Sequence, residues 1–306
     1  MDYIISFLNI LPSIIIFVLI FSVLILVHEW GHFITAIKSG VKVEEFGLGF
    51  GKKLWKKQVG EVEYSIGTIP FGGYVKMLGE EEHSNDPRSF EQAKLWKRMA
   101  ITLAGITMNL IFTIIAFVIL FSVGTTPILI SQTDIAQADS QGMVIWSKPD
   151  INGNKEIVAL REIKKGFPTA IPFAFQETWR ISKAILHKIA EIPREIIKDK
   201  KLPKGLSGPV GIAEATYKII PFGFWALLKL TALLSLSLAV MNLLPIPALD
   251  GGRFFFQIIE FILKPFGVKL NSEIENYIHM AGFTLLMLLI LVITWNDIVG
   301  LVARHF

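Results

Sequence analysis

The chain of 306 residues contains no cysteine. This absence excludes a disulfide-stapled fold and any metal site built from thiolate ligands. Charged residues are scarce as well, because Asp, Glu, Lys and Arg make up 18% of the chain, whereas soluble domains contain about 25%. The net charge is only +4, and no dense tract of Lys and Arg alternates with aromatic residues. The composition therefore argues against a soluble domain and predicts no nucleic-acid partner.

What the chain has in excess is long apolar runs. Hydrophobic residues account for 52% of the sequence, the mean hydropathy is +0.55, and the apolar residues collect in continuous stretches. A transmembrane helix needs about 20 mainly apolar residues. Four segments meet this requirement: Ser13–Ile37, Met99–Val123, Phe222–Leu244 and Met280–Leu301. We therefore predict an α-helical polytopic membrane protein whose four transmembrane helices lie in a lipid bilayer.

The direction of the spans follows from the charge of the segments that connect them. Residues 38–98, between the first and second spans, are rich in Lys and Arg close to both membrane ends. Short loops with this bias stay on the cytoplasmic side. We therefore expect the N-terminus and residues 124–221 outside, and residues 245–279 inside.

This order divides the chain into three parts: residues 1–123 with the first two spans and a cytoplasmic loop, residues 124–221 outside, and residues 222–306 with the last two spans. The external part has two short strand-like runs, 143–146 and 156–160, around an Asn152-Gly153-Asn154 turn, so we expect a small α+β segment. A helix is predicted from Phe175 to Ile197. Its mixture of apolar and basic residues suits the membrane surface, and packing against a small external domain is an equal alternative.

The first span ends in the segment His28-Glu29-Trp30-Gly31-His32. Residues four apart share one face of a helix, so both imidazoles can bind one metal ion, and Glu29 can reach a water on that ion. Zinc lowers the pKa of such a water from 15.7 to about 7, and a carboxylate can relay its proton to a leaving amine. The alternative is a buried polar cluster or a helix end that faces water. A charge in the middle of an apolar helix costs about 2.5–3.5 kcal/mol, which favours residues that have a partner.

A catalytic zinc usually has three protein ligands and one open position. The preferred third ligand is Asp250, in the segment Asn242–Gly252, where two prolines end the third span and two glycines permit an unusual backbone path. The first and third spans run in the same direction, so Asp250 and the two histidines belong to the same side of the bilayer. His279, at the start of the fourth span, is a reserve candidate.

These motifs resemble the site-2 protease family of intramembrane zinc metalloproteases. The resemblance is strongest to the bacterial branch of this family, the branch like the regulator-of-sigma-E protease, which releases membrane-bound anti-sigma factors. The resemblance rests on His-Glu-x-x-His at 28–32 and on Asn-x-x-Pro-x-Pro-x-Leu-Asp-Gly-Gly at 242–252. Residues 46–51, 69–76 and 207–213 match further family motifs. The second span departs from the family, because residues 105–109 read Gly-Ile-Thr-Met-Asn where a proline usually follows the glycine.

The resemblance implies a role for each matching residue. It implies that His28, His32 and Asp250 are the zinc ligands, that Glu29 is the catalytic base, and that Asn242 binds the substrate backbone near the scissile bond. Four residues would belong to a cytoplasmic, membrane-associated β-hairpin that holds an unwound substrate as an added strand: Phe71, Gly72, Gly73 and Tyr74. Strand addition is physically reasonable, because a helix shields its own peptide bonds.

The implied function is hydrolysis of single-span membrane proteins, such as anti-sigma factors, or of remnant signal peptides, in the bacterial inner membrane. The family's bacterial branch usually carries one or two PDZ domains between the second and third spans, and residues 124–171 are too few for one. A size filter on substrates would then be missing or altered. Two alternatives from other classes are a metal or proton transporter, with Lys229 and Asp297 on its pathway, and a scaffold that binds membrane helices without cutting them.

Overall fold

The computed structural model describes residues 2–80, 82–124, 144–149, 155–160, 164–199, 208–266 and 272–305. In these residues the protein is mostly helical. Four helical segments are long and apolar enough to cross a membrane: Pro12–Ser39, Leu95–Val123, Phe224–Leu243 and Ile274–Gly300. They coincide with the four predicted spans, and the fourth begins earlier than predicted. The protein is therefore organised as a multi-pass membrane protein.

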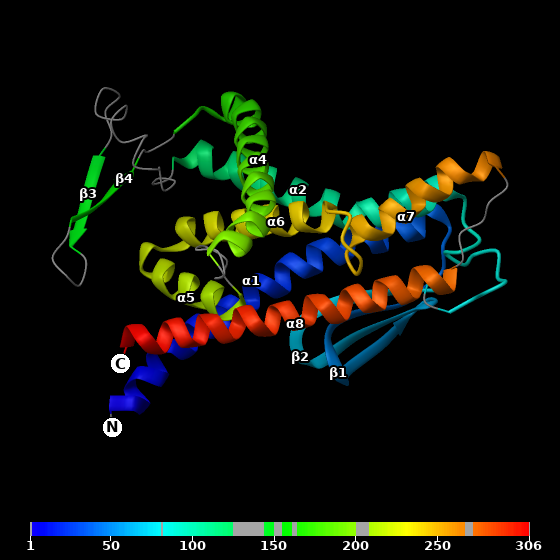
Figure 1. The fold of residues 1–306 in the computed structure, drawn as a ribbon, viewed down its shortest axis with the longest axis horizontal. Coiled ribbons are helices and arrows are strands. Elements are labelled where there is room, and N and C mark those ends of the chain that lie inside the picture. The colour runs from blue at the N-terminus through cyan, green and yellow to red at the C-terminus, as the bar shows by residue number, and fades with distance from the viewer. Residues whose placement is uncertain are drawn as a thin grey trace.

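Three of these helices form the packed part of the molecule. In Figure 1 they run along its long axis: α1 (Asp2–Ser39), α2 (Leu95–Val123) and α6 (Phe224–Leu243). Here α2 lies between the other two and contacts both. The helix α8 (Ser272–His305) lies outside them, and very little of its apolar span is buried. Two shorter helices complete this set: α5 (Pro209–Ile219) and α7 (Asp250–Leu263).

Small residues and internal hydrogen bonds hold the helices together. A Cβ atom at Gly31 of α1 would overlap the backbone of Ala104 in α2, so these two helices are in direct backbone contact. Between α2 and α6, Thr113 Oγ1 donates to the carbonyl of Ala232 at 3.3 Å, and Ser235 Oγ donates to the carbonyl of Asn109 at 2.9 Å. Lipid tails are as apolar as the helix surfaces, so close packing and such bonds are what favour helix association in a bilayer.

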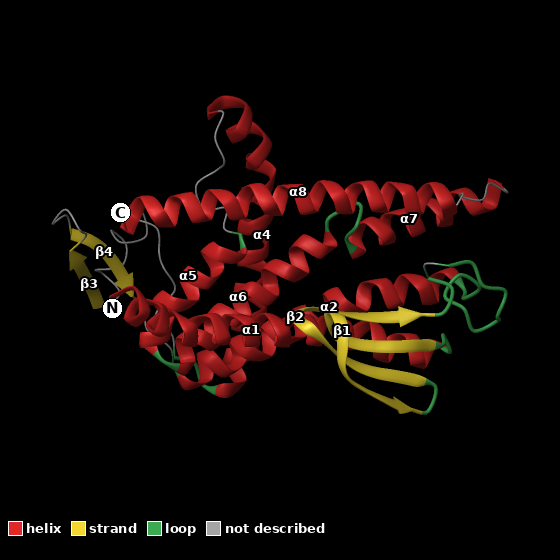
Figure 2. Ribbon diagram, turned by 90° about the horizontal axis from the view of Figure 1, so that it is seen from below, coloured by secondary structure: helices red, strands yellow, loops and turns green. Residues whose placement is uncertain are grey.

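A β-hairpin follows α1, as predicted. Its strands β1 (Val43–Val59) and β2 (Val62–Met77) pair from Val59↔Val62 at the turn to Val43↔Met77 at the base. The strands are bent, so residues 45–48 of β1 lie between residues 73–76 and residues 63–66 of β2. The resulting curved sheet lies beside the cytoplasm-directed ends of α1 and α2 in the predicted topology (Figure 2). A core of seven residues joins it to the helices: Phe33, Ala36, Val41, Val43, Phe46, Met77 and Ile101.

The segment after α2 contains two strands and a long helix. The predicted strands are confirmed as β3 (Val144–Pro149) and β4 (Lys155–Leu160), which pair antiparallel, and the predicted turn at 152–154 lies outside the described residues. The helix α4 (Phe167–Asp199) begins well before the predicted residue 175. Its first turns pack on α2 and α6 through buried Ala170 and Ala174, and this packing outweighs the helix-breaking tendency of a proline at 172.

In Figure 1, α4 crosses α2 and α6 rather than running parallel to them. One face of its first half is packed against these helices, whereas Phe167, Phe175 and Trp179 are exposed. The helix thus packs on the spans rather than on the small external strands that one interpretation of the sequence named, and its position at a membrane surface stays a prediction.

Asp297, near the end of α8, caps the start of α5. The backbone N–H groups of Gly208 and Gly211 donate to its Oδ2 atom at 2.8 and 2.9 Å. The first N–H groups of a helix lack partners within the helix, and a carboxylate there is also favoured by the helix dipole. This contact gives Asp297 a structural role and removes one of the two residues on which a transport pathway was based.

Replacing Asp297 with Ala should lower the free energy of unfolding by about 1–3 kcal/mol, because two hydrogen bonds to a charged acceptor are lost. Asp297→Asn should lose less, since one amide oxygen can still accept. Thermal unfolding of the detergent-solubilised protein measures both, with Thr284→Val on the exposed face of α8 as the control. Equal melting temperatures for the Ala variant and the parent protein would contradict the capping role.

Candidate metal centre

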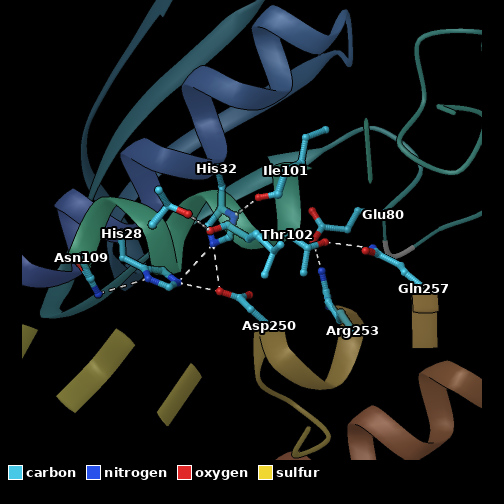
Figure 3. Close-up of polar contacts among 11 residues, drawn as sticks. His28, His32, Glu80, Ile101, Thr102, Asn109, Asp250, Arg253 and Gln257 are labelled. Atoms are coloured by element: carbon cyan, nitrogen blue, oxygen red, sulfur yellow. Dashed lines mark hydrogen bonds and ion pairs between the residues drawn. The ribbon is translucent and has the colours of Figure 1, made fainter. Parts of the chain in front are cut away.

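Two helices bring together the three ligands expected from the sequence. His28 and His32 lie one turn apart on α1, and Asp250 is the first residue of α7. The Nε2 atoms of the two imidazoles are 3.2 Å apart. Asp250 Oδ2 lies 2.9 Å from Nε2 of His28 and 3.3 Å from Nε2 of His32 (Figure 3). The three atoms thus form a nearly equilateral triangle.

The dimensions of this triangle fit a zinc ion. Ligand atoms about 2.0–2.1 Å from zinc, at the tetrahedral angle, lie about 3.3 Å from one another. The observed separations run from 2.9 to 3.3 Å. In the described part of the chain, the buried Oδ2 atom of Asp250 makes no hydrogen bond of acceptable geometry, although both imidazoles are close. A metal ion would satisfy this oxygen and both nitrogens at once, and His and Asp are common zinc ligands.

The second nitrogen of His32 has a partner that fixes its protonation. Its Nδ1 atom lies 2.8 Å from the carbonyl oxygen of Ile101 in α2, which can only accept. The proton therefore resides on Nδ1, and the Nε2 lone pair remains available for a metal. An outer hydrogen bond of this kind orients nearly all histidines that bind metals.

The second nitrogen of His28 faces the amide of Asn109. The Nδ2 atom of Asn109 lies 3.3 Å from His28 Nδ1, and the buried Oδ1 atom of Asn109 has no partner among the described residues. The oxygen and nitrogen of an amide are assigned from their hydrogen bonds. With the amide turned by 180°, Oδ1 accepts from His28 Nδ1–H, which leaves the Nε2 lone pair of His28 available for a metal ion. We therefore assign this orientation.

Asn109 is the main residue that the sequence analysis missed. It appeared there only as the last residue of a motif in the second span. It is fully buried in α2, and its own carbonyl accepts the hydrogen bond from Ser235. A signal was present, because a polar amide in an apolar span needs a partner for the same reason as the two histidines.

Glycines allow the backbone to come this close. A Cβ atom at Gly105 of α2 would overlap the imidazoles of His28 and His32, so only glycine leaves room for them. After α6 ends at Leu243, the chain turns back, and α7 starts at Asp250, as the prolines in this segment predicted. A Cβ atom at Gly252 would overlap the carbonyl of Ile246 in that connection.

A cavity of about 320 Å³ lies next to the triangle. Its walls include His28 and Asp250 together with Asn242, Gly72 and Gly73. The structure thus brings these three predicted substrate-binding residues beside the metal ligands. Phe71 lies in β2, and the position of its side chain is outside the described part of the structure.

Tyr74, the fourth predicted hairpin residue, is held inside the hairpin. Its hydroxyl donates to the carboxylate of Glu45 at 2.5 Å, and its ring stacks on Phe50. Burial alone would raise the pKa of Glu45, but hydrogen bonds from Lys53, Ser65 and Tyr74 lower it below its usual value. Burial and the bond to Glu45 raise the pKa of Tyr74. The phenol is therefore neutral and serves to hold the hairpin.

Glu29 and a second, larger cavity complete the site. This cavity, of about 750 Å³, is lined by Glu29 and both histidines and extends along Glu80 and Arg253. Glu29 also lines the smaller cavity, so this residue borders both cavities beside the metal ligands. Glu80 and Arg253 form an ion pair, which ties the loop after β2 to α7 (Figure 3).

His279, the reserve ligand, does not join the triangle. Its Nδ1 atom accepts a hydrogen bond from the backbone N–H of Ala248 at 3.0 Å. The ligand group in the described residues consists of His28, His32 and Asp250.

Comparison with known proteins gives a consistent family. Residues 16–289 match the model of Peptidase family M50. A protein of Clostridium acetobutylicum that carries a zinc metalloprotease name is 34% identical, over 94% of this chain and 97% of that protein. The regulator of sigma-W protease RasP of Bacillus subtilis and the zinc metalloprotease RasP of Bacillus licheniformis are each 26% identical, over 94% of this chain and 98% of those proteins.

The relatives differ in length. The alignment with the Bacillus subtilis protein extends over 423 positions and that with the Clostridium acetobutylicum protein over 337, although each covers 94% of this chain. The Bacillus protein thus has many more residues that have no counterpart here. The clostridial alignment exceeds the covered part of this chain by far fewer positions, so that relative is nearer to this chain in length.

The family match covers most of the chain, its relatives carry zinc metalloprotease names, and the two histidines and one aspartate fit that metal. The chain belongs to peptidase family M50 and is a zinc-dependent metalloendopeptidase of the site-2 protease type.

Proposed function

We propose that this protein hydrolyses peptide bonds within or near the transmembrane segments of single-span membrane proteins. In this proposal His28, His32 and Asp250 hold the zinc ion, and Glu29 is the general base. The observation that supports it most is the triangle of ligand atoms, with sides of 2.9 to 3.3 Å, at an apolar helix long enough to cross a membrane.

Bound zinc supplies a water molecule with a pKa near 7, which is a nucleophile at neutral pH. Glu29 follows His28 directly and faces the same cavities, so its carboxylate can accept the proton of that water and pass it to the leaving amine. Asn109 and the Ile101 carbonyl keep both imidazoles in the tautomer whose Nε2 lone pair points to the ion.

The larger cavity is the proposed path for water. Its wall away from the ligands is polar and includes Glu44, Lys76, Glu80 and Arg253. The positive residues of the adjacent hairpin, whose turn region from 50 to 60 is exposed, favour the cytoplasmic side. We therefore place the N-terminus outside and the active site toward the cytoplasm of a bacterial inner membrane.

The smaller cavity is the proposed place of the scissile bond. Residues 69–77 of β2 pair with β1 along one edge, and their pairs in the described residues lie on that side only. A Cβ atom at Gly73 would lie 3.3 Å from Cγ of Glu29, so this strand passes beside the base. An unwound substrate added along the other edge would present its backbone to Glu29 and to the amide of Asn242.

The class of substrate follows from this geometry and from one relative. A strand binding site beside an intramembrane metal suits a single transmembrane segment that has unwound locally. The Bacillus subtilis relative is named a regulator of sigma-W. We therefore propose anti-sigma-factor-like membrane proteins or remnant signal peptides as substrates, with an external size filter that is absent or altered in this short form.

Replacing Glu29 with Gln should lower the rate of cleavage at least about 100-fold, because general base catalysis contributes this much or more. Zinc content should stay unchanged, since Glu29 is not one of the three ligands. Cleavage of a fluorogenic peptide with one transmembrane segment, in proteoliposomes, measures the rate, and Glu195→Gln on α4 is the control. Cleavage by the Gln variant at the parental rate would contradict the assignment of the base.

Replacing Asn109 with Leu should weaken zinc binding about 10- to 100-fold, the usual effect of losing the partner of a metal-binding histidine. Asn109→Asp should keep the affinity, because its carboxylate still accepts from His28. Competition with a chelator measures both dissociation constants. Thr113→Val, one turn further along α2, removes another buried polar group without touching an imidazole, and it should bind zinc normally.

Asn242→Leu should separate substrate binding from metal binding. We expect kcat/KM to fall about 10-fold, as for the loss of one hydrogen bond that leaves a polar partner unsatisfied. Zinc affinity should remain parental, because Asn242 lines the cavity but is not a member of the ligand group. A parallel loss of zinc would show that Asn242 acts on the metal site instead.

A further inference from the structure

Ala248, two residues before Asp250, has an unusual backbone conformation. Its φ angle is +81°, and among the described residues it is the only one other than glycine with a positive φ. A side chain disfavours this region, so such a residue persists only where its surroundings enforce it. Ala248 lines both cavities of the site. The contacts that hold Ala248 in this conformation therefore affect the shape of the site.

One contact comes from His279 on α8. The backbone N–H of Ala248 donates to Nδ1 of His279 at 3.0 Å. Because Nδ1 accepts, the imidazole is neutral and its proton is on Nε2, 3.9 Å from Oε1 of Glu275. The imidazole side chain is 13% exposed and packs beside the ring of Phe256 from α7, with 5.5 Å between ring centroids. The acceptor is thus held in one place.

The neighbouring turn of α8 meets the same connection. A Cβ atom at Gly282 would overlap both the side chain and the carbonyl of Pro247. Little else of the apolar span of α8 is buried, and its contacts elsewhere include Ile293 and Asp297 at the start of α5. The contacts of α8 with the site are therefore concentrated on Pro247 and Ala248.

The conformation of Ala248 decides where Asp250 lies. The connection closes a turn around Pro247 and Ala248, in which the N–H of Leu249 donates to the carbonyl of Ile246 at 3.1 Å. The helix α7 then begins directly, because the N–H groups of Gly252 and Arg253 both donate to the carbonyl of Leu249. Asp250 follows Ala248 at a distance of at most about 7 Å along the chain. A change of φ at 248 to the ordinary negative value would swing this short segment and move the carboxylate away from the imidazoles.

We propose that His279 is a positioning residue, which holds Ala248 in its left-handed conformation and thereby aims the Asp250 carboxylate at His28 and His32. The inference rests on the proposed role of Asp250 as a zinc ligand. It assigns to α8, which contributes no ligand, a specific role in building the metal site.

The test is the zinc dissociation constant of the full-length protein in detergent, measured by competition with a chelator. His279→Leu removes the acceptor and should weaken zinc binding about 10-fold or more. His279→Asn should bind zinc with nearly parental affinity, because its Oδ1 atom can occupy the position of Nδ1. His187→Leu, an exposed histidine on α4, is the matched control and should have no effect.

The decisive variant is Ala248→Gly. Glycine adopts positive φ without strain, so its backbone no longer depends on the hydrogen bond. In the His279→Leu background it should restore most of the lost zinc affinity. If His279 only filled space, the glycine would restore nothing. Parental affinity of His279→Leu, or a double variant as weak as the single one, would overturn the proposal.

Two further variants keep the outcome interpretable. Gly282→Ala pushes α8 away from Pro247 and should also weaken zinc binding, with recovery by Ala248→Gly; it serves as the measurement if His279→Leu does not fold. Asp250→Ala tests the assumption that Asp250 is a zinc ligand. If it retains parental affinity, the ligand assignment is wrong. If it loses zinc while His279→Leu and Gly282→Ala do not, only the positioning role is wrong.

Discussion

The architecture depends on one constraint, which is that polar groups inside an apolar helix need partners from the protein. His28 and His32 lie in a span that lipid would otherwise surround, and their two Nδ1 atoms meet Asn109 and the carbonyl of Ile101 in α2. Their two Nε2 atoms meet Asp250 from α7. Each imidazole thus has a partner at both ring nitrogens, and the two helices that supply these partners, α2 and α7, must lie within hydrogen-bond distance of α1. The close packing of α1 on α2 follows from this requirement.

The same constraint explains why glycines stand where they do. Gly31 and Gly105 let α1 and α2 approach until backbone and imidazoles touch, and Gly73 lets β2 pass beside Glu29. A soluble metalloprotease can use a hydrophobic core to press its elements together, but the helices of this protein gain little from burial against lipid. Geometry within a few tenths of an ångström must then come from close contacts and hydrogen bonds. The hairpin is held by such a bond between Tyr74 and Glu45.

Local patterns in the sequence were sufficient to predict the spans and the positions of the metal ligands along the chain. Apolar run length located the spans, the i, i+4 spacing placed both imidazoles on one face, and the prolines predicted the break before Asp250. Partnerships between distant positions could not be predicted in this way. Nothing local links Asn109 to His28, or His279 to Ala248, because these pairs are separated by 81 and 31 residues. The start of α4 was misplaced for a related reason, since the packing of Ala170 on other helices outweighed a proline that indicates a helix end. The roles of Tyr74 and Asp297 likewise depend on contacts that only the fold creates.

A metal site assembled from separate membrane helices has a particular weakness, because the aspartate stands at the start of the short helix α7, directly after an irregular connection, and not within a span. Irregular backbone at this depth must satisfy its own N–H groups, and the connection does so partly through α8. In the proposed arrangement, the hydrogen bond from α8 helps to hold Ala248 at positive φ, and the position of the carboxylate depends on the docking of α8. An outer helix with few other buried residues therefore controls a ligand that it does not touch. In such an arrangement the metal site is complete only after all the helices have packed together. A chain whose helices have not yet packed would hold zinc weakly, and it would therefore cut membrane proteins poorly.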